Sequence, residues 1–224
     1  MSDAVTTPQE VAPAHRQSSF LTLALGSVGG VPASVGVVEG NAIPYKPEAA
    51  AKKKENGEKW LDRDPEVRCY MPGIPRAMYM PYPFQITQGT NKIQMAFEIN
   101  AAQRVIHLDQ VAPPPNDTWM GHSVGRWEGN TLVTTVDHFN DRTWFSRAGD
   151  FHSDALKVTE RFTPITPDAI RYSATIEDPD TFTRPFSSSI SSTVPLKLVN
   201  GPSATRTCSP ISKMIEGLGR SAPS

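Results

Sequence analysis

The sequence predicts an all-β fold, in which an antiparallel meander closes as a β-barrel or folds as a half-open sandwich. From Phe84 onward the chain is a succession of short runs rich in β-branched and aromatic residues, separated by turn residues. Helical periodicity is absent from these runs. Seven or more short strands at this spacing are typical of an antiparallel barrel or sandwich. The length of 224 residues suits one such domain.

Composition divides the chain into three parts. Residues 1–42 are rich in Ala, Val, Ser, Gly and Pro without a sustained period, so we expect a loosely ordered, irregular N-terminal arm. We expect residues 43–210 to form a single barrel domain and residues 211–224 to form a flexible tail. The longest apolar stretch begins at Phe20, but glycines and Pro32 interrupt it, so we expect no integral membrane segment.

One short surface helix is predicted over residues 46–57. Pro47 suits the first helical position, Glu48 suits the positive end of the helix dipole, and Gly57 suits the left-handed position that ends a helix. The segment has no apolar face, so we expect it to lie on the surface with its three consecutive lysines in solvent.

Residues 69–85 carry four prolines, which exclude a helix and a central strand. The same segment is rich in Tyr, Met and Phe, so we expect an extended chain that packs against other residues. It either seals one end of the core or forms an adaptable wall of a ligand pocket. In the second alternative, Tyr79 and Met80 contact the ligand.

The strand-like runs follow this segment directly. The stronger ones cover residues 84–88, 92–99, 104–109, 120–128, 131–139, 155–163 and 169–177, and two weaker ones cover residues 182–193 and 196–199. The runs at 120–128 and 131–139 meet at Gly129-Asn130, which is typical of a two-residue hairpin turn.

The register that this turn imposes places His122 directly opposite Asp137, with Cβ atoms about 4.5–5.5 Å apart. A carboxylate beside an imidazole fixes the tautomer of the ring, which suits a general base. We therefore take His122 as a candidate base and Asp137 as the residue that orients it. The alternative is a His–Asp hydrogen bond on a solvated face, which needs no function.

Apolar side chains share the hairpin face that carries His122, and such a mixed face resembles a ligand cavity. These side chains are Met120, Val124, Val133 and Phe139. Met120 and Arg126 are the ligand contacts that we expect from this face.

Two further groups of residues are candidates for the site. The long connection at 140–154 is polar, and in it Asn140 and Trp144 are candidate ligand contacts and His152 a candidate catalytic residue; the alternative is a solvated loop. Glu98 and Arg104 flank a turn and form either a surface salt bridge or a buried pair that orders the pocket.

The net charge and the absence of known motifs limit the kinds of molecule that this chain is expected to bind. The formal net charge is -1, so no basic field for nucleic acid exists. The sequence contains no Walker-type loop, no GxGxxG and no GxSxG, and none of its five histidines lies in an HxH or HExxH motif. We therefore expect neither a cofactor nor a metal. Cys69 and Cys208 are either two free thiols or one disulfide.

Four segments resemble a broad group of mostly bacterial, usually exported, uncharacterised proteins. They are IPYKPEAAAKKKEN, DPEVRCYMPGIPRAMYMPYPFQI, GHSVGRWEGNTLVTTVDHFND and FHSDALKVTERF, and the group's signatures include GRWEGDTLVV and HSDALxVxERF. The resemblance singles out Ser123 and Glu160 among other residues, and it implies export; without it we expect a cytoplasmic protein. The group often carries its acidic residue at the position of Thr135 and not at that of Asp137. Separately, Gly125-x-Trp127 resembles the GxW motif of lipocalin-like (calycin) barrels.

These observations lead to two hypotheses of function. The first is a cofactor-independent enzyme, a lyase, isomerase or cyclase of biosynthesis, which acts by acid–base chemistry on a small, largely apolar, aromatic or polycyclic molecule in a hydrophobic cavity. His122, Asp137 and His152 would be its catalytic residues. The second is a lipocalin-type binding or carrier protein that uses the same pocket without turnover. The sequence is compatible with a homodimer.

Overall fold

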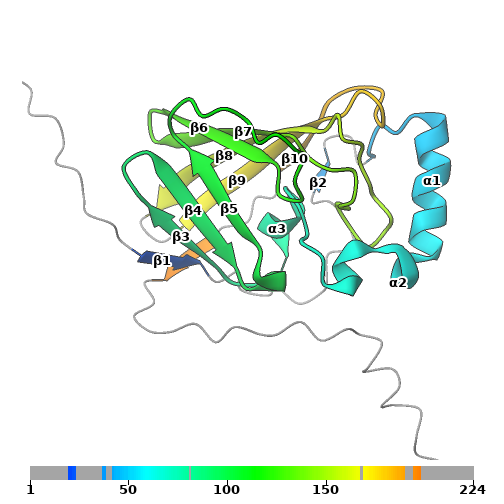
Figure 1. Ribbon diagram of the computed structural model, residues 1–224, viewed down its shortest axis with the longest axis horizontal. Helices are drawn as coiled ribbons and strands as arrows, with labels where there is room; N and C mark the ends of the chain where they lie inside the picture. The colour runs from blue at the N-terminus through cyan, green and yellow to red at the C-terminus, as the bar shows by residue number, and fades with distance from the viewer. Residues whose placement is uncertain are drawn as a thin grey trace, which may run out of the picture.

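The computed structural model describes residues 42–80, 82–166 and 169–189, and the backbone of three short strands outside these ranges. The fold is mainly β: one eight-stranded, mostly antiparallel sheet curls into a half-barrel, with a few short helices beside it (Figure 1). The predicted β architecture is confirmed at this level. Residues 1–41 of the predicted arm lie outside the described residues, except for the backbone of two short strands. The predicted tail at 211–224 lies outside them as well.

The eight strands lie in the sheet in their sequence order. They are β3 (Phe84–Gln88), β4 (Lys92–Phe97), β5 (Gln103–His107), β6 (His122–Glu128), β7 (Thr131–Asp137), β8 (Lys157–Thr166), β9 (Ala169–Glu177) and β10 (Phe186–Ser189). Three short strands extend this sheet: β1 (Phe20–Leu23) pairs with β3, β2 (Val37–Val38) with β10, and β11 (Val194–Lys197) with both β1 and β9. The bounds of β3 and β9 are those of the predicted runs.

The pair formed by β5 and β6 departs from the predicted antiparallel meander. These two strands run parallel, and their register joins Ile106 with Ser123 and His107 with Val124. Parallel neighbours require a long connection that returns the chain to the same end of the sheet. Residues 108–121 form this long connection. Its length, too great for a hairpin, was the feature of the sequence that could have predicted the parallel pair.

Two α-helices lie together at one end of the molecule, α1 (Pro47–Glu58) and α2 (Trp60–Arg63) (Figure 1). α1 confirms the predicted helix and its Pro47 start. Gly57, however, lies inside the helix, where a Cβ atom would come within 2.7 Å of the Ala148 carbonyl oxygen. Its role is therefore close packing against a loop. No helix among the described residues is long and apolar enough to cross a membrane.

The proline-rich segment contains one short helix, α3 (Arg76–Tyr79), contrary to our expectation. Pro75 precedes its first residue, a place where proline's missing N–H breaks no helical hydrogen bond. The expected packing is confirmed, since Ile74 and Met78 are almost fully buried in the core. Two single-turn 3-10 helices complete the fold, η1 (Pro65–Arg68) and η2 (Ile99–Ala101).

The interior of the half-barrel is lined by the hairpin face opposite to the one that we predicted. Ser123, Leu132 and Val136 are buried on the inner face, whereas Arg126 is exposed on the outer face that also carries His122. Both faces mix apolar and polar residues, so alternation alone could not decide which one points inward.

Met120 and Phe139 are nevertheless buried in the core, although the alternation would place them on the outer face with His122. Gly121 and His138 have positive φ angles of 69° and 55°, which interrupt the alternation at both ends of the hairpin. The chain therefore turns inward just before β6 begins and just after β7 ends.

Candidate functional site

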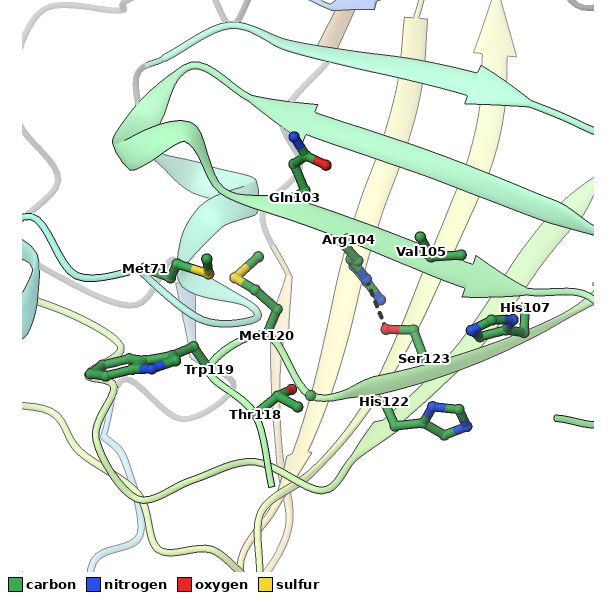
Figure 2. Close-up of a pocket in the computed structure, with 11 residues that line it drawn as sticks. Met71, Gln103, Arg104, Val105, His107, Thr118, Trp119, Met120, His122 and Ser123 are labelled. Atoms are coloured by element: carbon green, nitrogen blue, oxygen red, sulfur yellow. Dashed lines mark hydrogen bonds between the residues drawn. The ribbon is translucent and has the colours of Figure 1, made fainter. Parts of the chain in front are cut away.

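A cavity of about 340 Å³ lies beside the parallel strand pair, between β5 and residues 118–123. Figure 2 shows the 11 residues that line it. Gly121, one of these residues, has a positive φ of 69° at the point where the chain enters β6. A Cβ atom there would lie 2.7 Å from a methyl group of Val136 and 2.8 Å from the Asp137 carbonyl oxygen, so the turn requires glycine.

Three of the predicted site residues meet at this cavity: Arg104, Met120 and His122. Trp119 also lines it, and its ring stacks on Tyr70 with a centroid distance of 4.9 Å and an interplanar angle of 4°. The ring of Tyr70 is half exposed, so an aromatic surface lies at the edge of the cavity.

The predicted hairpin register is confirmed, since His122 pairs with Asp137 across β6 and β7. The predicted side-chain contact is wrong. The carboxylate of Asp137 instead bonds Nδ1 of His138, its neighbour in sequence, at 2.8 Å. The positive φ of His138 turns this ring back toward the carboxylate side of the hairpin.

His122 therefore lacks the predicted orienting carboxylate. Its Nε2 atom is buried and has no hydrogen-bond partner among the described residues. Its contacts are with two other imidazoles: His107 stacks on it at a centroid distance of 5.5 Å, and His138 meets it edge-on at 6.2 Å. The three rings form a row on the outer face of the sheet.

Arg104 is the centre of a buried polar network. Its Nε donates to Oγ of Ser123 at 2.9 Å, and its two terminal nitrogens bond the two carboxylate oxygens of Glu160, one of them at 3.1 Å. Tyr172 donates its hydroxyl to the same carboxylate at 2.8 Å. Burial and the neighbouring carboxylate raise the pKa of Tyr172 well above its usual value, so this hydroxyl stays a donor.

The network corrects the predicted partner of Arg104. One of the two predicted alternatives was a buried ion pair between Glu98 and Arg104. Arg104 does form a buried ion pair, but its partner is Glu160, which lies 56 residues away in sequence. The available signal was a glutamate at an inward position of an otherwise apolar strand pattern, in VTERF. Both Glu160 and Ser123 also belong to the signatures of the resemblance.

His152 lies in the core and away from the cavity. It is 1% exposed, and its ring packs edge-on against Phe139. Nδ1 bonds the Ser153 carbonyl at 2.7 Å, and because a carbonyl only accepts, Nδ1 carries the proton and Nε2 accepts from Thr143 at 2.5 Å. Burial lowers the pKa of His152, which favours the neutral ring, so the predicted catalytic residue lies in the core with both ring nitrogens bonded.

Six other predicted ligand contacts lie away from this cavity. Tyr79 donates its hydroxyl to the Phe145 carbonyl at 2.5 Å, and burial raises its pKa. Trp144 packs on Ala49 of α1, and Met80 packs on the core. The remaining three are Arg126, which bonds Glu128 on the exposed surface, Asn140, which accepts from the Arg142 backbone, and Glu98, which precedes η2.

A second, smaller cavity of about 130 Å³ lies inside the half-barrel, near the tips of its hairpins. Apolar side chains line it, among them Ile106, Leu132 and Phe162. Among the described residues, no group of three or more His, Cys, Asp or Glu side chains is arranged to hold a metal ion. Cys69 is disulfide-bonded, as one of the two predicted alternatives had it; Cys208, the other cysteine of the sequence, lies outside the described residues.

Comparison with models of protein families, with curated proteins and with solved structures finds no match for this chain. The resemblance to exported bacterial proteins and to lipocalin-like barrels stays a prediction.

Proposed function

We propose that the chain binds a small, largely apolar aromatic molecule in the cavity beside β5 and acts on it by acid–base chemistry, with His122 as the base. A lyase, isomerase or cyclase reaction without a cofactor requires such a base and little more. From the sequence we expected the ligand inside the barrel. The positions of Arg104, Met120 and His122 instead favour the cavity beside β5.

Cavity size supports the choice of location. Pockets for small molecules span about 300–1,000 Å³. The cavity beside β5 reaches this range at about 340 Å³, whereas the one inside the half-barrel holds about 130 Å³. The lining also suits an aromatic ligand, because Trp119 and Met120 offer a flat ring and an adaptable thioether.

The observation that carries the proposal is that His122 lines this cavity while its buried Nε2 has no hydrogen-bond partner in the described part of the chain. Buried polar atoms nearly always have a hydrogen-bond partner, and leaving one without a partner costs about 1–3 kcal/mol. Such a cost is common at functional sites, where a ligand supplies the partner. An imidazole at a partly apolar cavity is also the usual means of moving a proton near neutral pH.

The second candidate function is that of a carrier without turnover. One observation favours it: Asp137 bonds His138, so His122 lacks the carboxylate that was predicted to orient it. A carrier needs shape and a few hydrogen bonds, and the cavity offers both without an oriented base.

We also propose that the half-barrel closes into a complete, lipocalin-like barrel. The support is the position of β11, which pairs with β1 through Lys197 and Leu196 and with β9 through Val194 and Pro195. Because β1 in turn pairs with β3, these contacts would join β3, at one edge of the eight-stranded sheet, to β9, which lies next to β10 at the other edge.

One ketone tests the function, 2-acetylnaphthalene, which is flat, aromatic and carries a methyl group of weakly acidic C–H bonds. Equilibrium dialysis measures its binding. Proton NMR in heavy water measures exchange of its methyl protons for deuterium, a reaction in which a base takes a proton from carbon while the carbonyl oxygen receives the electron pair.

We expect saturable binding and protein-catalysed exchange. His122→Asn should keep the affinity within about threefold and slow exchange by about 10²–10⁴-fold, the usual contribution of one acid–base group. His138→Asn is the matched control, because its ring lies on the same face but does not line the cavity. Binding without exchange in the unmodified protein would favour the carrier, and no saturable binding would exclude both functions at this cavity.

A further inference from the structure

We propose that Ser123 is the hydrogen-bond donor that selects the ligand, and that the ligand carries an uncharged acceptor oxygen such as a ketone carbonyl. This inference rests on the proposed function, because it concerns the same cavity. It adds the residue that recognises the polar end of the ligand.

The hydrogen bonds of Ser123 leave one proton free. Its Oγ accepts from Nε of Arg104 at 2.9 Å, and a hydroxyl has one proton of its own to donate. Among the described residues, no acceptor takes that proton. Ser123 lines the cavity and is 1% exposed, so a donor without an acceptor lies in a desolvated place.

Figure 2 shows the Ser123 hydroxyl in the gap between β5 and residues 118–123, bonded to Arg104. The position of the hydroxyl is therefore fixed. Arg104 is itself held by two bonds to Glu160, whose carboxylate also accepts from Tyr172. A donor fixed in this way loses little freedom when a ligand binds, and accepting from a cationic group makes its own proton a stronger donor.

Charge decides between a neutral and an anionic ligand. The Arg104 guanidinium is paired with the Glu160 carboxylate, and both side chains are buried, at 1% and 0% exposure. Apart from Arg104, the lining residues that can titrate are His107 and His122. An anionic ligand would lose its hydration without meeting a net positive charge, so a neutral oxygen fits better.

The donor also suits the chemistry of the site. When His122 removes a proton from the carbon beside a carbonyl group, the electron pair moves to the carbonyl oxygen, which becomes an enolate. A hydrogen-bond donor already aimed at that oxygen stabilises the developing charge. Ser123 and His122 are neighbours in sequence, yet both reach this cavity because it lies at the splayed edge of the strand.

The test compares two probes of nearly the same shape, 2-acetylnaphthalene and 2-isopropenylnaphthalene, in which a CH₂ group replaces the carbonyl oxygen. We expect the unmodified protein to bind the ketone about three- to tenfold more tightly, the usual range for one neutral hydrogen bond. Ser123→Ala should reduce this preference to one or below, because the carbonyl oxygen is then buried without a donor. Thr118→Val is the control, because Thr118 also brings a hydroxyl to the lining.

The preference is a ratio measured within each variant, so small changes of the cavity affect both probes alike. Ser123→Ala removes the acceptor of Arg104 Nε and could unfold the chain; Ser123→Cys, a weak donor of similar size, should then lower the preference in the same direction. A preference that is unchanged in Ser123→Ala or Ser123→Cys, or that disappears in Thr118→Val, overturns the inference. Equal affinities for both probes in the unmodified protein would also overturn this inference, but the proposed function would stand. If the unmodified protein binds neither probe, the proposed function itself is wrong.

Discussion

Arg104 and Glu160 form a two-pronged ion pair in the interior of the half-barrel, with side chains 1% and 0% exposed. Removing one partner of a buried pair leaves an uncompensated charge. We expect Glu160→Ala to lower the free energy of unfolding by about 3–5 kcal/mol, as measured by urea denaturation. The double variant Arg104→Met with Glu160→Leu should recover most of that loss. A double variant no more stable than Glu160→Ala would argue against this account.

The hydroxyl of Tyr172 should contribute to stability through the same carboxylate. Tyr172→Phe removes its hydrogen bond to Glu160 and keeps the ring, so we expect a loss of about 1 kcal/mol in urea denaturation. Tyr70→Phe is the matched control, because Tyr70 is half exposed, and it should change stability by less than about 0.5 kcal/mol. Equal effects in the two variants would mean that the Tyr172 hydroxyl contributes nothing.

His152 should make stability depend on pH. Its pKa is lowered in the folded protein by burial, so between this value and the unfolded value of about 6.5 the unfolded chain binds more protons. Stability therefore falls as the pH drops below about 6.5. The variant His152→Asn should be less stable at pH 7 but show a flatter profile from pH 7 to 5 in urea denaturation. An unchanged slope would assign the dependence to other groups.

Gly149 should tolerate no side chain. Its φ is +86°, and a Cβ atom would lie 2.4 Å from the Gly57 backbone nitrogen and 2.5 Å from the Lys53 carbonyl oxygen, both in α1. We expect Gly149→Ala to lower the melting temperature, at a cost of about 2–4 kcal/mol from backbone strain and overpacking together. Gly89→Ala is the control, because its nearest neighbour would lie at an ordinary 3.5 Å. A stable Gly149→Ala variant would show that the loop can move off α1.

Asp137 should be dispensable for the proposed chemistry. Because its carboxylate bonds His138, Asp137→Asn is expected to leave the deuterium exchange of 2-acetylnaphthalene within about twofold, whereas His122→Asn slows it by about 10²–10⁴-fold. The NMR assay in heavy water compares the two variants directly. Comparable losses in both would restore the pairing of His122 with Asp137 during the reaction.

Local patterns in the sequence determined the elements and the register of the central hairpin. The Gly129-Asn130 turn aligned His122 with Asp137 because a two-residue turn leaves one register for the strands that it joins. Pro47 set the start of α1 for an equally local reason, since proline fits the first turn of a helix. Such features depend on residues a few positions apart, so the chain itself specifies them.

Only the tertiary structure decided which residues meet at the site. Arg104 and Glu160 lie 56 residues apart, and their pairing depends on how the sheet curls and on the parallel contact of β5 with β6. The inward face of the hairpin depended on what packs against it, because both faces carry apolar and polar residues. The gap beside β5, and the Ser123 hydroxyl that lines it, exist only because residues 118–123 come to lie next to β5 in the folded chain.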